Sequence, residues 1–128
     1  TKRILEKAKE MGAKRLVIDS ITAFSLWLGD VTKIRLAMYY LIEELRKMDV
    51  TTILTCETSG KKDELSRFGV EEFLTDGVIM MYFFPPHRSI FVRKMRGTAN
   101  DKAVHPFEIS DKGIEVNSRE ELLWESLR

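Results

Sequence analysis

The 128-residue sequence contains no glutamine and a single cysteine, Cys56. One cysteine excludes an internal disulfide framework and is typical of a reducing compartment, so we predict a cytoplasmic protein with Cys56 as a buried small hydrophobe. No apolar run reaches the length of a membrane span and no signal peptide is visible, so we expect no membrane partner. The two histidines, His87 and His105, lack the spacing of metal ligands and are predicted to be structural.

An excess of charge of either sign is also missing. The chain carries 21 Lys and Arg against 20 Asp and Glu, for a net charge of +1. Such a balance gives no general attraction to nucleic acid or membrane, so any anion site must be local. Abundant Lys and Glu, with no Gln and little Asn, point to a thermophilic or archaeal source.

The first half of the chain alternates helix and strand. Two helices are expected, over residues 2–11 and over residues 33–48 with Thr32 as the cap. The stretches RLVIDS and TTILTCE follow them as strands that end in acids. We expect a loop at 21–31 and a polar, mobile segment at 58–68.

The second half is rich in strands. GVEEFLTD predicts a short turn or helix, GVIMMYFF and RSIFVRKM predict two strands around a PPH turn, and HPFEI with GIEV predicts a hairpin at Ser110–Gly113. Ser118 and Glu121 form a capping box for a tail helix. Continuous apolar strands such as LVI predict burial on both faces, as in parallel sheets covered by helices. The predicted fold class is therefore α/β, a three-layer, mostly parallel sheet flanked by helices, with a C-terminal β-hairpin and a tail helix.

Polar side chains follow both buried strands of the first half. Asp19 and Ser20 come after RLVI, and Thr55 and Glu57 come after TTIL. Ligands of open α/β sheets bind at the carboxyl ends of the strands, where an acid can hold the hydration shell of magnesium and a polar group can face a γ-phosphate. The alternative is that Asp19 caps a turn and that Glu57 begins a solvated loop.

A cationic cluster ends the fourth strand, in the stretch VRKMRGT. Lys94 and Arg96 are two residues apart and share a face in an extended chain. Arg96 offers a planar fork to phosphate oxygens, Gly97 lets the backbone turn, and Thr98 can donate a hydrogen bond. The alternative is internal pairing of the cations with Glu71, Glu72 or Glu108.

Together, RLVIDSITAF, TTILTCE, SRFGVEEFLTDGVIMMYF, IFVRKMRGTAN and HPFEISDKGIEV resemble the KaiC-like branch of the RecA-type ATPases, from about residue 1 to residue 116. The resemblance implies a RecA-like fold, ATP and Mg²⁺ as cofactors, and a ring-shaped homo-oligomer, a hexamer, with ATP between subunits.

The resemblance also implies a role for each matching residue. Asp19 is similar to the Walker B acid, which holds Mg²⁺ through water, with Ser20 beside it. Thr55 and Glu57 match the strand end that faces the γ-phosphate. The segment that reaches the neighbouring subunit's ATP is matched by Lys94, Met95, Arg96 and Thr98. Asp111 matches a position near the nucleotide's sugar or base, again across the interface. Asn100 stands where many relatives have His, so it can donate a hydrogen bond but cannot carry a proton.

A phosphate-binding loop is missing from these residues. SGKKDE is the nearest candidate, but Thr55 stands at the first glycine position and Lys62 replaces the hydroxyl residue. In the family this loop and the water-activating glutamate lie upstream. We therefore interpret residues 1–128 as a single partial domain, the carboxyl-terminal half of an ATPase, with a core half (1–117) and a C-terminal helix (118–128).

This interpretation has consequences for the isolated chain. It should not hydrolyse ATP, and a core strand with an unpaired edge should make it self-associate, rearrange or pair with the missing half. Two other functions stay open. A recombination-type, DNA-binding ATPase would use Trp27, by base stacking, and residues 61–67. A non-catalytic interaction module would only scaffold partners. Packing of Trp27 within the subunit or against a neighbour is the alternative to stacking.

Overall fold

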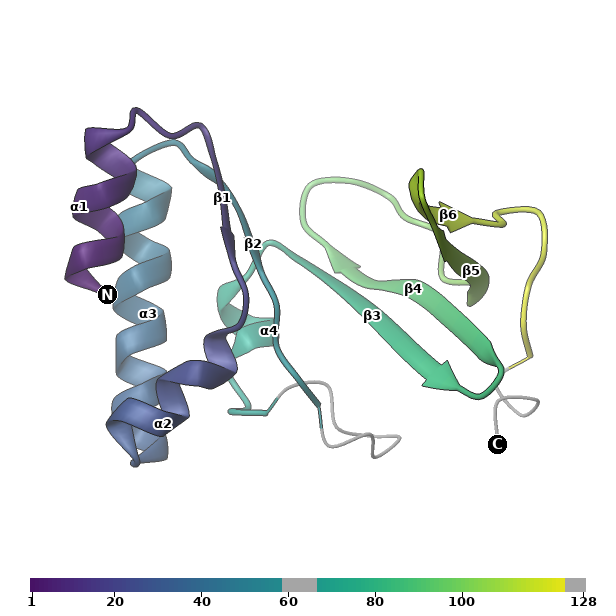
Figure 1. Ribbon diagram of the computed structural model, residues 1–128, viewed down its shortest axis with the longest axis horizontal. Helices are drawn as coiled ribbons and strands as arrows, with labels where there is room; N and C mark the ends of the chain where they lie inside the picture. The colour runs from purple at the N-terminus through teal and green to yellow at the C-terminus, as the bar shows by residue number, and fades with distance from the viewer. Residues whose placement is uncertain (59–66, 124–128) are drawn as a thin grey trace. The chain divides into compact units, whose positions relative to one another are not determined.

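The computed structural model describes residues 1–58 and 67–123 of the chain (Figure 1). The chain separates into two compact units, Thr1–Thr75 and Asp76–Arg128. The first unit holds all the helices of the described residues, and the second is built of strands. The expected mobility of residues 58–68 falls largely on 59–66, outside the described residues.

The helices of the first unit follow the apolar pattern of the sequence. They are α1 (Lys2–Glu10), the 3-10 helix η1 (Ile21–Ala23), α2 (Phe24–Leu28), α3 (Val31–Lys47) and α4 (Glu71–Leu74). The helices predicted near 2–11 and 33–48 are therefore confirmed. The loop predicted at 21–31 is wrong, because residues 21–28 are helical until Gly29 adopts φ +63° and ends α2.

The start of α3 differs from the prediction by two residues. Asp30, not Thr32, is the cap, and its Oδ1 accepts a hydrogen bond from the backbone N–H of Lys33 at 2.9 Å. Asp30 keeps an extended backbone (φ −118°, ψ 125°), as a capping residue must, whereas Thr32 already lies inside the first helical turn.

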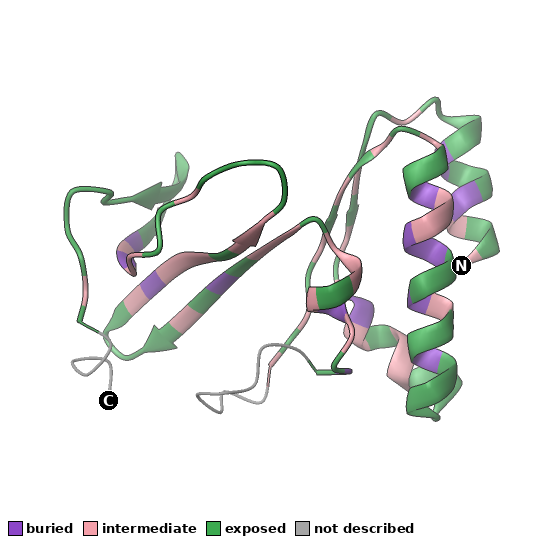
Figure 2. Cartoon of the chain, turned by 180° about the vertical axis from the view of Figure 1, so that it is seen from behind, coloured by how far each residue is buried: buried purple, intermediate pink, exposed green. Residues whose placement is uncertain are grey.

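The two strands of the first unit pair in parallel. β1 (Arg15–Ile18) lies beside β2 (Thr51–Leu54), with Val17 opposite Ile53. Helices α1 and α3 cover one face of this pair (Figure 1), and their buried side chains pack against alternate strand residues, which include Leu16, Ile18 and Leu54. Figure 2 shows the buried residues along one side of these helices.

The other face of this strand pair is open. Val17 is 62% exposed and Ile53 is 60% exposed. The prediction that these strands are buried on both faces is therefore wrong for the described residues. The physical reason is that α1 and α3, the two long helices of this unit, cover the same face.

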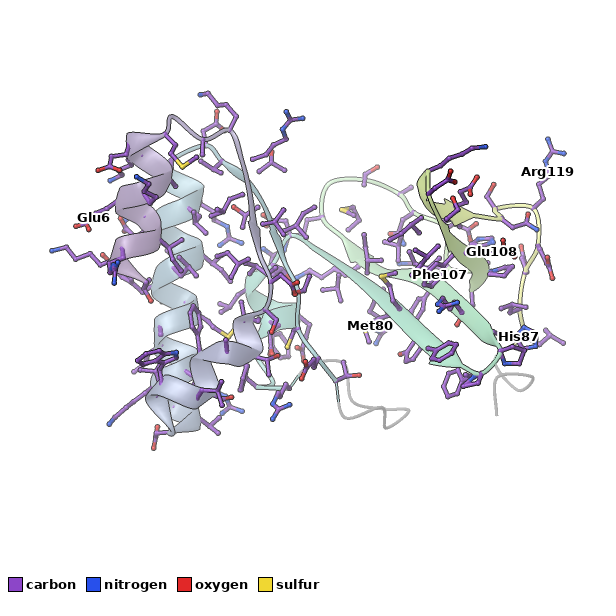
Figure 3. All side chains as sticks on the ribbon, viewed as in Figure 1. Glu6, Met80, His87, Phe107, Glu108 and Arg119 are labelled. Atoms are coloured by element: carbon purple, nitrogen blue, oxygen red, sulfur yellow. The ribbon has the colours of Figure 1, made fainter. Side chains whose placement is uncertain are left out.

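The second unit is an antiparallel sheet with the order β3-β4-β5-β6. Its strands are β3 (Gly77–Phe84), β4 (His87–Met95), β5 (His105–Ser110) and β6 (Gly113–Val116). The predicted hairpins around PPH and Ser110–Gly113 are confirmed. Met80 and Phe107 (labelled in Figure 3) are buried on β3 and β5. Ser89 is buried on β4 and His105 on β5. The Asp19–Ser20 and Pro85–Pro86 peptide bonds are cis.

The prediction of a tail helix is wrong for residues 118–123, which form a turn and an irregular segment. The backbone of this segment is bound to the sheet instead, because the N–H of Asn117 donates to Pro106 and the N–H of Leu122 donates to Val104. Asn117 Nδ2 also donates to Glu120 Oε2 at 3.0 Å. The remaining tail residues, Trp124 and Leu127 among them, lie outside the described residues.

Candidate functional site

The structure brings Asp19 and Thr55 together at the carboxyl ends of β1 and β2. Thr55 Oγ1 donates a hydrogen bond to Asp19 Oδ1 at 2.5 Å. The backbone is fixed at the same point, since the N–H of Thr55 donates to Ile18 and the N–H of Ile21 donates to Thr55, both at 3.0 Å. Both side chains are exposed, in phase with Val17 and Ile53 on the open face of the strand pair.

Ser20 and Glu57 lie next to this pair. Ser20 has an extended backbone and begins η1, where its carbonyl accepts a hydrogen bond from Ala23. The backbone N–H of Glu57 donates to Thr22 Oγ1 at 3.3 Å, and its carboxylate lies 3.7 Å from Arg67 Nη1 in an exposed ion pair. Thr22 was not predicted, although its place in the ITAF stretch after Asp19 puts it at the same sheet edge.

A magnesium ion held through its water shell suits this edge. Among the described residues, no group of three or more His, Cys, Asp or Glu side chains could ligate a metal directly. Magnesium bound with nucleotide keeps several waters and needs only one or two carboxylates besides the phosphates. Asp19, exposed and already accepting a hydrogen bond, fits that role.

The cysteine after Thr55 faces the other way, toward the core. Cys56 is half-buried, and its Sγ lies 3.2 Å from Glu71 Oε1 as a hydrogen-bond donor. Burial raises the pKa of the thiol to about 11, and the neighbouring carboxylate of Glu71 adds to the effect. Cys56 is thus a neutral donor as well as the small hydrophobe that we predicted.

The cationic end of β4 is shaped by a β-bulge. The register of the β3–β4 pairing shifts by one residue between Val78 and Ile79. Because of this shift, Arg96 rather than Met95 lies opposite Asp76. The N–H of Arg96 donates to the carbonyl of Asp76 at 2.8 Å, and its Nη1 lies 3.1 Å from Asp76 Oδ1. Asp76 was not among the carboxylates that we considered. The bulge that places it opposite Arg96 has no signal in the sequence.

The residues around Arg96 form a tight turn. Lys94 and Met95 are the last residues of β4 and are half-buried. Met95 covers Gly77, because a Cβ built on that glycine would lie only 2.9 Å from Met95 Sδ. Gly97 adopts a backbone φ of +72°, a conformation that glycine takes more readily than other residues. Thr98 is exposed, and its hydroxyl donates a hydrogen bond to the carbonyl of Ala99.

Asn100 anchors the loop that follows. Its Nδ2 donates to the carbonyls of Val92 and Asp101, both at 3.0 Å, and its Oδ1 accepts from Lys102 Nζ at 3.3 Å. These hydrogen bonds lie within its own unit, and a hydrogen bond from Asn100 to a nucleotide stays a prediction. Asp111 lies apart from this loop, exposed in the turn between β5 and β6.

Trp27 lies in α2 and is 87% exposed, next to Leu26 at 85%. Packing within the subunit is therefore not what the described residues show. The remaining expectations for Trp27, stacking on a base or docking against a neighbour, stay predictions.

The chain is similar to known ATPases and clock proteins. The family described as "ATPase: KaiC" matches residues 1–121. The crystal structure of a KaiC-like protein from the hyperthermophilic archaeon Pyrococcus horikoshii OT3 is 43% identical, with a TM-score of 0.77 over 90% of this chain and 51% of that chain. The circadian clock oscillator protein KaiC of Nostoc sp. is 34% identical over 89% of this chain and 23% of its own length. The circadian clock protein KaiC3 of Synechocystis sp. is 34% identical over 89% and 24%.

A parallel strand pair covered by helices, followed by an antiparallel sheet, is thus a partial RecA-type domain, and the predicted α/β, RecA-like class is confirmed. The chain belongs to the KaiC family of ATPases. It spans about half the length of the similar solved structure and about a quarter of the curated relatives. No helix among the described residues is both long and apolar enough to cross a membrane.

Proposed function

We propose that this chain contributes two separate parts of ATP sites in a KaiC-like ATPase. Asp19 and its neighbours would hold Mg·ATP in their own subunit, and the end of β4 would reach the ATP of the next subunit in a cytoplasmic homo-oligomer, a ring-shaped hexamer. The observation that carries this proposal is the hydrogen bond between Asp19 and Thr55, which joins the carboxyl ends of neighbouring parallel strands. Membership in the KaiC family supports it.

At the first part, Asp19 would accept hydrogen bonds from the waters around magnesium, with Ser20 beside it. Thr55 holds one carboxylate oxygen of Asp19 and so fixes the direction of the acid. When bound there, Mg²⁺ would neutralise charge that develops on the phosphates. Glu57, fixed through its backbone by Thr22, would face the γ-phosphate and orient polar groups there.

At the second part, Arg96 would give its guanidinium to a phosphate of the neighbouring subunit's ATP. At rest it pairs with Asp76, but the two side chains are 50% and 68% exposed. An exposed ion pair of this kind contributes only about 0–1 kcal/mol, so phosphate oxygens can displace the carboxylate. Lys94 would add a second charge and Thr98 a hydroxyl donor.

Met95 and Asn100 would stabilise the turn that carries Arg96. Met95 packs over Gly77, and Asn100 ties the loop after Gly97 back to Val92, so both hold the turn in place. Asp111, in the exposed turn after β5, would accept hydrogen bonds from the sugar or base across the interface.

The test is ATP hydrolysis by the intact protein, compared with Asp19→Ala and Arg96→Ala. An arginine acting in trans typically accounts for about 10³- to 10⁵-fold in rate, so Arg96→Ala should lose at least about 10³-fold in kcat. Arg93→Ala is the matched control, because Arg93 is an exposed cation three residues away. It should stay within about twofold. Equal rates for Arg96→Ala and Arg93→Ala would refute the role of Arg96, and magnesium-dependent turnover by residues 1–128 alone would refute the division of the site.

A further inference from the structure

Glu71 is a buried carboxylate with a full set of donors. It is 8% exposed at the start of α4. Its Oε1 accepts from the backbone N–H of Phe68 and its Oε2 accepts from the N–H of Val70, both at 3.0 Å. Burial of a carboxylate is unfavourable without such partners, so the site is built around the charge.

One further donor to Glu71 comes from the end of β2. Cys56 Sγ lies 3.2 Å from Oε1, and Cys56 packs against the buried cluster that includes Phe68. Thr55, Cys56 and Glu57 are then each held by a different residue. Thr55 bonds to Asp19, Cys56 to Glu71, and Glu57 through its backbone to Thr22.

The segment that carries Glu71 is itself fixed to α3 at both ends. Arg35 Nε donates to the carbonyl of Phe68 at 2.7 Å, and Arg46 Nη2 donates to the carbonyl of Leu74 at 2.6 Å. Since α3 also packs against the covered face of the strand pair, Glu71 links the strand end to α3.

We propose that Glu71 is a positioning residue for ATP hydrolysis, which holds the Thr55–Glu57 strand end in its place beside Asp19. The inference rests on the proposed function, because the strand end is assigned there to the γ-phosphate. Glu71 touches no part of the nucleotide site itself. Its effect passes through Cys56 and through the backbone of residues 68–70.

The chemistry requires a carboxylate at this position. Burial acts to raise the pKa of Glu71, but hydrogen bonds from the backbone N–H groups of Glu71, Val70 and Phe68 and from the Cys56 thiol outweigh it and lower the pKa. Both oxygens accept from N–H donors. An amide has one oxygen only, so its NH₂ group would face a donor and one backbone N–H would lose its partner.

The experiment compares Glu71→Gln with wild type in the intact protein, and uses Glu6→Gln as control for the same loss of charge. Glu6 is an exposed residue of α1 (labelled in Figure 3), 3.9 Å from Lys2. We expect Glu71→Gln to lower kcat for ATP about 10- to 100-fold, as displaced catalytic groups do. The affinity for ADP, which lacks the γ-phosphate, should change less than about twofold.

Variants at Cys56 test the path. Cys56→Ser keeps a donor and should retain kcat within about threefold, whereas Cys56→Ala should lower it in the same direction as Glu71→Gln. Equal losses of kcat and ADP affinity in Glu71→Gln would show general destabilisation and would overturn the proposal. So would an unchanged kcat.

A second readout does not depend on ATP. Amide hydrogen exchange at Thr55 and Glu57 should be faster in Glu71→Gln than in Glu6→Gln, because the strand end is released. Unchanged exchange would overturn the positioning role even if ATP hydrolysis were established. A wild-type protein without ATP hydrolysis, but with faster exchange in Glu71→Gln, would instead refute the proposed function and leave the structural link intact.

Discussion

At the scale of single residues, His105 is an ionisable side chain that stabilises the fold through hydrogen bonds from both ring nitrogens. It is buried on β5, with Nδ1 at 2.7 Å from the carbonyl of Glu120 and Nε2 at 3.0 Å from Asp101 Oδ2. The carbonyl of Glu120 and the carboxylate of Asp101 raise the pKa of His105, with a smaller contribution from the charge of Glu121. Hydrogen bonds from Ala103 and from His105 lower the pKa of Asp101.

These two directions predict how stability depends on pH. A raised pKa in the folded state means that protonated His105 stabilises the fold fully below its unfolded pKa of about 6.5. That stabilisation is lost as the pH rises through the folded pKa. For Asp101 the lowered pKa gives stabilisation above about pH 3.9 that is lost as the pH falls through the folded value.

Urea unfolding between pH 5 and 9 measures the effect of His105. The free energy of unfolding of the wild type should decrease as the pH rises above about 6.5, and His105→Asn should lack this decrease. His87→Asn is the control, since His87 is exposed at the start of β4, and it should behave as the wild type does. A decrease that persists in His105→Asn would contradict the assignment.

The candidate site shows what the sequence can predict for single residues. Asp19 and Thr55 were predictable, because an acid or hydroxyl directly after a buried parallel strand must lie at its carboxyl end. Asp76 was not, because its place opposite Arg96 depends on a bulge in the β3–β4 pairing. Glu71 was considered only as an ion-pair partner, since backbone donors leave no trace in a sequence pattern.

At the scale of elements, the periodicity of apolar residues predicted the long helices and most strands correctly. The ends of the helices, however, depended on local hydrogen bonds that compete with one another. Thr32 and Asp30 both suit a cap, and only the backbone conformation decides between them. Likewise, Ser118 and Glu121 have the spacing of a capping box, yet the backbone of Asn117 and Leu122 bonds to Pro106 and Val104 instead.

Capping of α3 gives a direct test of this choice. Asp30→Ala removes the acceptor for the N–H of Lys33 and should lower the free energy of unfolding by about 1 kcal/mol. Thr32→Ala, in the exposed first turn of the same helix, should change it by less than about 0.5 kcal/mol. Urea titration of the two variants would contradict the structure if their order were reversed.

At the scale of the whole molecule, each compact unit carries one part of the proposed ATP site. Asp19 and Thr55 belong to the first unit, and the Lys94–Thr98 turn belongs to the second. The face of the β1–β2 pair at Val17 and Ile53 is open and apolar among the described residues.

The central claim is that the two parts act on different ATP molecules, and mixing two inactive variants of the intact protein tests it most directly. Asp19→Ala keeps a working Arg96, and Arg96→Ala keeps a working Asp19. When equal amounts of the two variants mix randomly in rings, about a quarter of the interfaces would have an intact Asp19 on one side and an intact Arg96 on the other. The mixture should therefore regain about a quarter of the wild-type ATPase rate. If native mass spectrometry shows mixed rings and the rate does not exceed that of the separate variants, the account of a shared site is contradicted.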